Sequence, residues 1–400
     1  MVEVIRALKL NILPLTAQKD AELALLVKKY SEASKIIFKV CEYWDELPKS
    51  DDRFTRYSVQ KVVYRTVKAD YGLQSQLVVD IVKDIVTCFK SNGDSISSIP
   101  ISFNIPRSGK FAHTKNGNPV VSMAALNGRL AVPIAKDGAY ERYNEFIADG
   151  YTTTNFRLSY NIDHWTVTVM LRKDFDVKRG KNILGVDVGS RTLAAVSIVT
   201  PEHKILKQLY FGRDVWNRQR NISIRRSRLK SYSDKGSRKA VRLLKKLRTQ
   251  ETHFNNTRNY QIAHQIVDLA KTYDCSISIE DLKGLKDSRL SRKSNRRVKR
   301  MPYGTFRVAL GSVSAQKEVE AVKVNPYHTS KRCSRCGTLG YRTKNGAIFV
   351  CKCGMLVNAD RNASVNIAFD AGKTMFSNVL PQSIEGNLPV AASVCSNDGC

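Results

Sequence analysis

Three acids stand at the boundaries of apolar segments that lie far apart in the chain. Asp187 lies inside the apolar stretch ILGVDVG, Glu280 ends the apolar stretch CSISIE, and Asp360 begins the last helical pattern. An unpaired carboxylate is costly to bury, so a bound ligand explains these positions better than packing does. An acid at the end of a strand is also a common turn former. No single one of the three therefore decides between a functional and a structural role.

Together the three acids fit a ribonuclease H-like architecture, in which a mixed sheet brings acids from a first strand, a fourth strand and a following helix to one point. Carboxylates arranged in this way hold two divalent cations about 3.5–4 Å apart, one activating water and the other stabilising the leaving oxygen of a phosphodiester. Mg²⁺ prefers such oxygen ligands. We therefore predict that Asp187, Glu280 and Asp360 are catalytic and bind Mg²⁺, and we interpret the neighbouring Asp281 as a cap or turn acid.

Four of the nine cysteines form two close pairs. The segments CSRC (333–336) and CKC (351–353) enclose a spacer of 14 residues that has the glycine turns and β-formers of a hairpin. Four thiolates suit a tetrahedral Zn²⁺ ion, and they leave no coordination position for a reactive water. We predict a structural zinc ribbon, with four free cysteines as the alternative. The ligands are then Cys333, Cys336, Cys351 and Cys353.

The charge of the chain predicts a polyanionic partner. Lys and Arg number 66 against 36 Asp and Glu, which gives a formal net charge of +30. No apolar run approaches the ~18 residues of a membrane-spanning helix, and the first 15 residues alternate like a strand. Nucleic acid is therefore favoured over membrane, and we expect an intracellular protein, cytoplasmic and nucleoid-associated if the source is prokaryotic.

Two basic runs are the predicted nucleic-acid contacts. Residues 218–248 hold thirteen Lys or Arg and one acid, which is typical of a phosphate-binding helical face, with a solvated surface as the alternative. Residues 286–300 hold eight basic residues and predict a loop beside the acids, with a nuclear-localisation patch as the alternative. The predicted contact residues are Arg225, Arg226, Arg228, Lys245, Lys246, Arg292, Lys293, Arg296 and Arg297.

The periodicity of the sequence predicts a multidomain α+β protein. Alternating residues over 1–15 and 98–177 indicate a small β-barrel, interrupted by a bundle of three or four helices between 16 and 97. Three strands follow in a meander, then a long basic helical region to about residue 271. The strands CSISIE and AVKVNP, the cysteine region and a helix from 360 to 371 complete an α/β nuclease domain of ribonuclease H type.

Four sequence blocks resemble those of a known family. ILGVDVGSRTLAAVSIV, ISIEDLKGLK, VNPYHTSKRCSRCG and CKCGMLVNADRNASVNIA resemble the RuvC-I, RuvC-II, zinc-finger and RuvC-III blocks of the TnpB (OrfB) family. These are transposon-encoded RNA-guided DNA endonucleases, related to compact type V CRISPR effectors and to Fanzor proteins. The resemblance covers residues 181–372. The first 175 residues resemble the family's wedge domain with an inserted recognition lobe in order only.

The resemblance implies a domain layout and a set of roles. The catalytic acids fall on Asp187, Glu280 and Asp360, and the zinc ligands on the four paired cysteines. A structured guide RNA from the transposon end, a short transposon-adjacent motif on duplex DNA and cleavage of both strands by one RuvC site are also implied. The predicted domains are a wedge (1–15 and 98–177), a recognition domain (16–97), a RuvC-like nuclease domain (178–324 and 356–372), a zinc ribbon (325–355) and a loose tail (373–400).

The sequence thus predicts an RNA-guided DNA endonuclease that serves transposon maintenance and acts as a monomer within a ribonucleoprotein. A nucleic-acid-binding regulator that retains the fold without useful cleavage is the main alternative. A compact CRISPR effector shares these motifs, and the neighbouring genes would distinguish it from a transposon protein. A guide-independent nuclease fits the acids but leaves the zinc insertion and the N-terminal half without a purpose.

Overall fold

The computed structural model describes residues 1–46, 55–92, 100–161, 164–189, 192–281, 303–343 and 346–375. The chain divides into two compact units. One comprises Glu3–Asp174, and the other comprises Phe175 onward together with Met1–Val2. The finer division into wedge, recognition, nuclease and ribbon domains stays a prediction.

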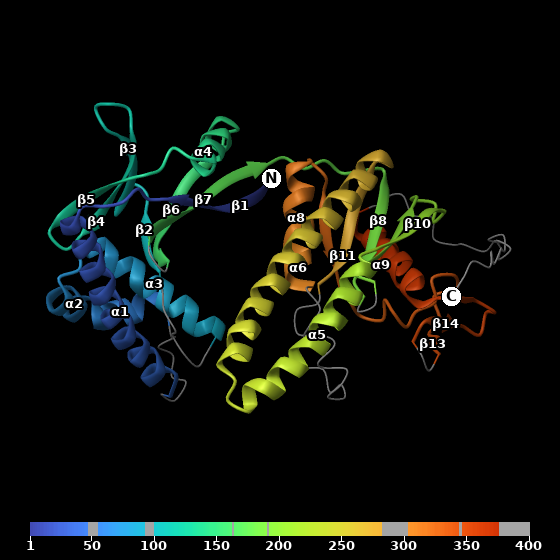
Figure 1. Ribbon diagram of the computed structural model, residues 1–400. Helices are drawn as coiled ribbons and strands as arrows, with labels where there is room; N and C mark the ends of the chain where they lie inside the picture. The colour runs from blue at the N-terminus through green and yellow to red at the C-terminus, as the bar shows by residue number, and fades with distance from the viewer. Residues whose placement is uncertain are drawn as a thin grey trace. The chain divides into compact units, whose positions relative to one another are not determined.

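Three helices form the helical part of the first unit: α1 (Ala17–Glu46), α2 (Arg56–Tyr71) and α3 (Ser75–Asn92) (Figure 1). Helix α2 buries Val59, Val63 and Val67, which recur every four residues and so lie on one face. It begins with a capping box between Thr55 and Ser58 and ends at Gly72, whose φ of 64° closes the helix in the left-handed conformation. The predicted helical region between the first two strands is confirmed.

The prediction of a closed β-barrel was wrong. Strands β1 (Val2–Asn11), β7 (His164–Phe175), β6 (Thr152–Asn161) and β2 (Ile101–Asn104) form one sheet in that order. Strands β3 (Gly109–His113), β4 (Pro119–Ala125) and β5 (Gly128–Pro133) form a second sheet. An isolated bridge joins Ile12 to Ile134. Alternating apolar residues show that one strand face is buried, and they carry no information on whether the strands close on themselves. Helix α4 (Gly138–Ala148), which Asp137 caps, was not predicted.

The second unit is built on a mixed five-stranded sheet in the order β10-β9-β8-β11-β12. Strands β8 (Asn182–Asp187), β9 (Ala194–Val199) and β10 (Ile205–Phe211) pair antiparallel, which confirms the predicted meander. Strand β11 (Cys275–Glu280) runs parallel to β8 and to β12 (Ala321–Val324). The carboxyl ends of β8 and β11 therefore meet at the same edge of the sheet.

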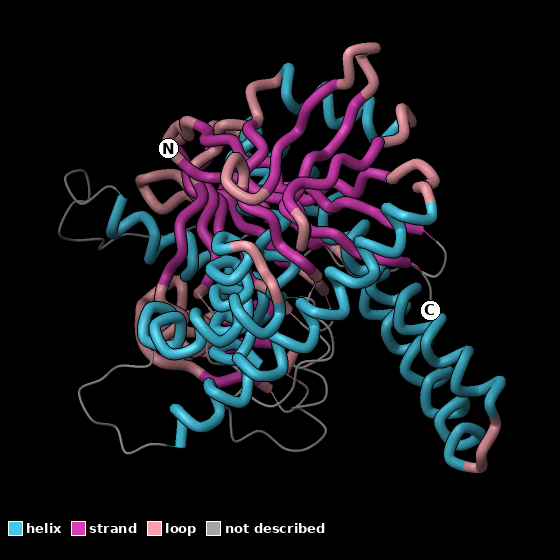
Figure 2. Tube along the Cα trace, turned by 90° about the vertical axis from the view of Figure 1, so that its left-hand side faces the viewer, coloured by secondary structure: helices cyan, strands magenta, loops and turns pink. Residues whose placement is uncertain are grey.

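Helices cover both faces of this sheet (Figures 1 and 2). Leu184 and Val186 of β8 pack with residues of α6 (Arg238–Thr272) and α8 (Tyr303–Gln316). The long helix α5 (Arg213–Asp234) pairs with α6 as a hairpin. Helix α8 was not predicted, because Gly304 and Gly311 interrupt its helical pattern.

Helix α9 (Ala359–Met375) covers the opposite face and fits very closely against β8. A Cβ atom added at Gly185 would lie 2.1 Å from the carbonyl oxygen of Ser364 and 2.7 Å from the amide nitrogen of Ala368. Beside this contact, the Ser364 and Ser197 hydroxyls lie 2.6 Å apart. The Ser278 hydroxyl lies 3.3 Å from the carbonyl oxygen of Ile367. Small and hydroxyl-bearing residues thus let the helix backbone approach the sheet.

The cysteine region lies in sequence between β12 and α9. It contains a small antiparallel sheet of β13 (Tyr341–Arg342), β14 (Ile348–Val350) and β15 (Leu356–Asn358). Phe349, Cys333, Cys351 and Ala359 form its buried core. This core connects the region to the first residue of α9.

The close approach at Gly185 leads to a stability prediction. We expect Gly185→Ala to lower the free energy of unfolding by about 1–3 kcal/mol, because the added methyl group meets backbone atoms that cannot move independently. The matched control is Gly311→Ala in α8, where nothing lies within 4 Å of the added atom. It should be neutral or stabilise the protein by about 0.5–1 kcal/mol. Chemical denaturation of the two variants measures the difference, and equal stabilities would contradict the proposed contact.

Candidate active site and cysteine cluster

Asp187 and Glu280 end two neighbouring parallel strands. The register pairs Ile279 of β11 with Val186 of β8, so the next step along both strands brings Glu280 beside Asp187. Asp187 alternates with Gly185 and therefore points to the α9 face of the sheet. Both side chains are buried, with Asp187 9% exposed and Glu280 8% exposed. The two predicted acids are thus on one edge, side by side.

Asp360 reaches the same edge from the first turn of α9. The Asn358 side chain caps the helix by accepting hydrogen bonds from the backbone N–H groups of Asp360 at 3.0 Å and Arg361 at 3.2 Å. Ser364, one turn later, lies over Gly185, so Asp360 lies toward the end of β8. A Cβ atom added at Gly189, just after β8, would lie 3.8 Å from Asp360 Oδ2.

The three acids interact electrostatically. Burial raises the pKa of Asp187 well above its usual range, and the negative charges of Asp360 and Glu280 raise it further. Burial also raises the pKa of Glu280, although a hydrogen bond from Thr329 opposes the shift. The positive charge of Arg342 lowers both pKa values. The positive charge of Arg342 is therefore too small to offset the burial and mutual repulsion of these carboxylates.

Arg342 is a residue of this site that the sequence patterns did not single out. It belongs to β13 of the cysteine region, and its Nη1 lies 3.8 Å from Asp360 Oδ1. The side chain is 35% exposed, so the guanidinium faces solvent as well as the acids. The cysteine region therefore contributes a cation to the acidic edge of the sheet.

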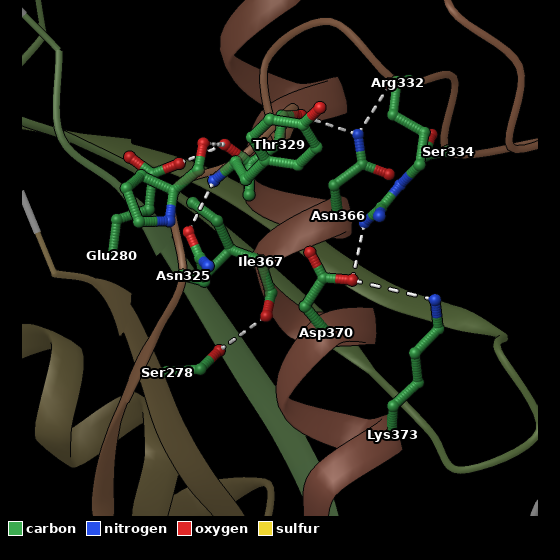
Figure 3. A network of polar contacts seen from close by, with 12 residues as sticks. Ser278, Glu280, Asn325, Thr329, Arg332, Ser334, Asn366, Ile367, Asp370 and Lys373 are labelled. Atoms are coloured by element: carbon green, nitrogen blue, oxygen red, sulfur yellow. Dashed lines mark hydrogen bonds and ion pairs between the residues drawn. The ribbon is translucent and has the colours of Figure 1, made fainter.

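A polar network fixes the Glu280 side chain from the side of the cysteine region (Figure 3). The buried Thr329 hydroxyl donates to Glu280 Oε1. The Asn366 side chain of α9 donates to the carbonyl oxygens of Thr329 and Arg332, both at 2.7 Å. Arg332 in turn pairs with Asp370 of α9 at 2.7 Å. Helix α9 thus holds the segment that holds Glu280.

Helix α8 supports the other side of the strand end. The Tyr303 hydroxyl donates to the backbone carbonyl of Glu280. Asp281 accepts a hydrogen bond from Arg307 at 2.8 Å, and its backbone N–H donates to the carbonyl oxygen of Val324 at 2.9 Å. Asp281 is engaged in these contacts at the strand end, in keeping with its interpretation as a turn acid.

The four paired cysteines converge on one point. Their sulfur atoms all lie within 4.8 Å of one another, with Cys333 and Cys353 3.7 Å apart and Cys336 and Cys351 3.5 Å apart. A Zn–S distance of about 2.3 Å in a tetrahedron places sulfur atoms about 3.8 Å apart, so the cluster fits this ion. A hydrogen bond with Thr338 lowers the pKa of Cys351 to about 6, which favours its thiolate.

The acids are spread more widely than the cysteines. Among the residues that the structure describes, the cysteines are the only group of three or more His, Cys, Asp or Glu side chains whose ligand atoms lie this close together. The acids nevertheless supply the hard oxygen donors that Mg²⁺ prefers, and the mutual repulsion around Asp187 would be relieved by a divalent cation. The chemistry of the donor set therefore fits the predicted ion.

The described part of the basic runs lies on the α5–α6 hairpin. Arg225, Arg228, Lys245 and Lys246 are exposed on this hairpin. Arg226 instead forms an ion pair with Glu251 of α6, so it joins the two helices. The remaining predicted contacts, Arg292, Lys293, Arg296 and Arg297, lie outside the described residues.

Comparison with known proteins relates both site regions to one family. Residues 303–367, which include the cysteines and Asp360, match the family model described as the TNB domain of Cas12f1-like proteins. The CRISPR-associated endodeoxyribonuclease Cas12f1 of Sulfoacidibacillus thermotolerans is 25% identical over 336 residues, covering 80% of this chain and 75% of that protein. A TnpB-like protein of Aquifex aeolicus (strain VF5) is 26% identical over 250 residues, covering 58% of this chain and 82% of that protein. These matches relate the chain to TnpB-like and Cas12f1 proteins.

Solved structures of Cas12 proteins share the fold of this chain. A Cas12f1–sgRNA–target DNA complex matches with a TM-score of 0.64 at 15% identity, covering 92% of this chain and 99% of that one. The mini-RNA-guided endonuclease CRISPR-Cas_phi3 matches with a TM-score of 0.51 at 12% identity, covering 92% of each. The shared mixed α/β multidomain fold confirms that part of the predicted fold class. In the described part of the chain, no helix is both long and apolar enough to cross a membrane.

The buried charge of Asp187 makes stability depend on pH. Its pKa is raised in the folded state, so the carboxyl contributes stability below its unfolded pKa of about 3.9, and this contribution is lost as the pH rises toward the folded value. In magnesium-free buffer we expect Asp187→Asn to be more stable than the wild type at pH 7 by at least about 1 kcal/mol. The difference should shrink toward zero below pH 4.

Denaturation across this pH range provides the measurement. Asp234→Asn, at an exposed acid near the end of α5, is the control and should change stability little at any pH. A destabilised Asp187→Asn protein at pH 7 would show that the fold itself stabilises the carboxylate and would contradict the expectation that Asp187 binds a cation.

Proposed function

We propose that this TnpB-like protein is an RNA-guided DNA endonuclease that hydrolyses phosphodiester bonds at Asp187, Glu280 and Asp360. The convergence of these acids from β8, β11 and α9 at one edge of a mixed sheet carries the proposal. We interpret this convergence as a ribonuclease H-like, RuvC-type site that holds two divalent cations. The match to a relative named as an endodeoxyribonuclease supports the same activity here.

A guide RNA and a DNA target are the proposed partners. The Cas12f1 structure with the same fold is a complex with sgRNA and target DNA. In such systems base pairing selects the sequence, while the protein contributes charge, recognition of duplex shape and cleavage. We extend this to a guide derived from a transposon end, a short adjacent motif on duplex DNA, cleavage of both strands, and one protein chain per ribonucleoprotein. The exposed cations of the α5–α6 hairpin then bind nucleic-acid phosphates.

Mg²⁺ bound by the three carboxylates would activate water and stabilise the leaving oxygen. The chain's own residues prepare the site for this chemistry. Thr329 holds the Glu280 carboxylate on one side, and Asn358 orients the first turn that carries Asp360. Arg342 adds a fixed positive charge that faces Asp360 and suits a phosphate oxygen of the substrate.

Zn²⁺ at the cysteine cluster is proposed as a structural ion. Cys333, Cys336, Cys351 and Cys353 would complete its coordination and leave no position for substrate. The ion would hold residues 325–355 as a ribbon inserted in the nuclease domain. It would thereby fix the strand that carries Arg342.

The acids are tested by substitution. Asp187→Ala or Glu280→Ala should reduce Mg²⁺-dependent cleavage of target DNA below detection, because each removes a buried ligand of the cations, while nucleic-acid binding stays within about twofold. Cleavage is measured on gels and binding by a filter or polarisation assay. Asp234→Ala, at the exposed acid near the end of α5, is the matched control and should cut normally. Undiminished cleavage by either active-site variant would rule out this metal site.

Sequencing of RNA that copurifies with the protein from its host separates the remaining alternatives. One RNA species with a variable 3′ end supports guiding. Random RNA together with cleavage indicates an unguided nuclease. A single RNA species with no cleavage by the wild type indicates a guided regulator.

The zinc site has a separate test. We expect about one zinc per chain by elemental analysis, and Cys336→Ser with Cys351→Ser should lose the ion and lower the melting temperature. Cys88→Ser, at a cysteine outside the cluster, should keep it. Folded wild-type protein without zinc would contradict the assignment.

A further inference from the structure

The row of residues that contains the acids extends further across the sheet. Asp187 pairs with Ala195 of β9, and Ala195 pairs with Tyr210 of β10. Cross-strand partners point to the same face, so Tyr210 lies on the α9 face together with Asp187 and Glu280. Two strand spacings, on the order of 10 Å, separate Tyr210 from Asp187. Strand β10 is at the edge of the sheet, and Tyr210 is 40% exposed.

Helix α9 places an arginine over this tyrosine. Arg361 follows Asp360 directly, and its guanidinium carbon lies 5.3 Å from the centre of the Tyr210 ring. The contact restricts the direction of a long side chain that is otherwise exposed. The guanidinium is therefore held beside the acids, on the side toward β10.

Arg361 differs from the other arginines around the site in its electrostatic partners. Arg332, Arg307 and Arg342 each form an ion pair with a carboxylate. Within the described ranges, no ion pair engages the Arg361 guanidinium. An oriented, exposed guanidinium without a carboxylate partner suits a phosphate, which it can bind through two parallel hydrogen bonds.

We propose that Arg361 and Tyr210 form a subsite for the DNA backbone beside the three acids. Arg361 binds a phosphate near the scissile one, and Tyr210 holds the guanidinium in position. The subsite rests on the proposed nuclease function, because the acids define which phosphate is cut. It lies on the β10 side of Asp187, whereas Arg342 approaches Asp360 from the cysteine region. The strand would thus contact cations from two different elements.

A cycle of protein and substrate changes tests this contact. The probe is a DNA strand complementary to the bound guide, with a single neutral methylphosphonate moved one linkage at a time around the cut. Arg361→Ala should slow cleavage of unmodified DNA about tenfold, as should the methylphosphonate at one neighbouring linkage with the wild-type protein. The two changes together should slow cleavage no further, because both remove the same contact.

Further variants separate positioning from general charge. Arg361→Lys should recover part of the rate, and Tyr210→Ala should give a smaller loss at the same linkage. Lys204→Ala removes one exposed charge just before β10 and should leave the rate unchanged. The subsite would be overturned if the rate losses from Arg361→Ala and from the methylphosphonate multiplied at every linkage. An equally slow cleavage by Lys204→Ala would also overturn it. Normal cleavage by Asp187→Ala would instead overturn the assignment of the active site to the three acids, and absence of cleavage by the wild type would overturn the nuclease function, so these failures are distinguishable from failure of the subsite.

Discussion

The close packing of α9 on β8 is the contact on which the rest of the candidate site depends. Gly185 leaves no room between the strand and the helix backbone at Ser364 and Ala368. Hydrogen bonds through the Ser197 and Ser278 hydroxyls fix the helix at the same level. Since Asp360 lies one turn before Ser364, this packing sets its distance from Asp187. A larger residue in the contact would move a carboxylate as well as a helix.

The cysteine region is coupled to the acids through two neutral side chains and one arginine. Asn366 binds the backbone at Thr329 and Arg332, and Thr329 binds Glu280. Arg342 joins the same region to Asp360. Two of the three acids therefore have partners in a segment whose own core is small and built around cysteines. The positions of Glu280 and Asp360 therefore depend on the folding of that segment.

Sequence patterns predicted the strands of the second unit well, because buried strands such as CSISIE are continuous apolar runs between turn residues. They also indicated the four cysteines that the structure gathers, since close spacing along the chain limits how far two thiols can separate. The closed barrel was wrong, and α4 and α8 were missed. Closure of a barrel depends on contacts between strands that are distant in sequence. Gly304 and Gly311 lower the helix propensity of α8, which forms because its apolar residues pack in the core of the second unit.

The residues that surround the acids were harder to predict for a related reason. Thr329, Arg342 and Tyr210 reach the site only because the sheet, α9 and the cysteine region are folded together. None of them has a distinctive spacing relative to Asp187 or Glu280. Arg361 directly follows Asp360 in the sequence, but the direction of its side chain is set by Tyr210 on strand β10. Local patterns identify the groups that carry charge, and long-range packing decides where they point.

The packing of α9 on the sheet also has a consequence for biosynthesis. The chain emerges from its N-terminus, so the strands that bear Asp187 and Glu280 are made long before the helix that covers them. Until then this sheet face meets water, and Gly185, Ser197 and Ser278 expose less apolar surface than large aliphatic residues would. The small residues that admit the helix thus also limit the apolar surface that the domain exposes before α9 is made, and the acid set is completed only when α9 docks.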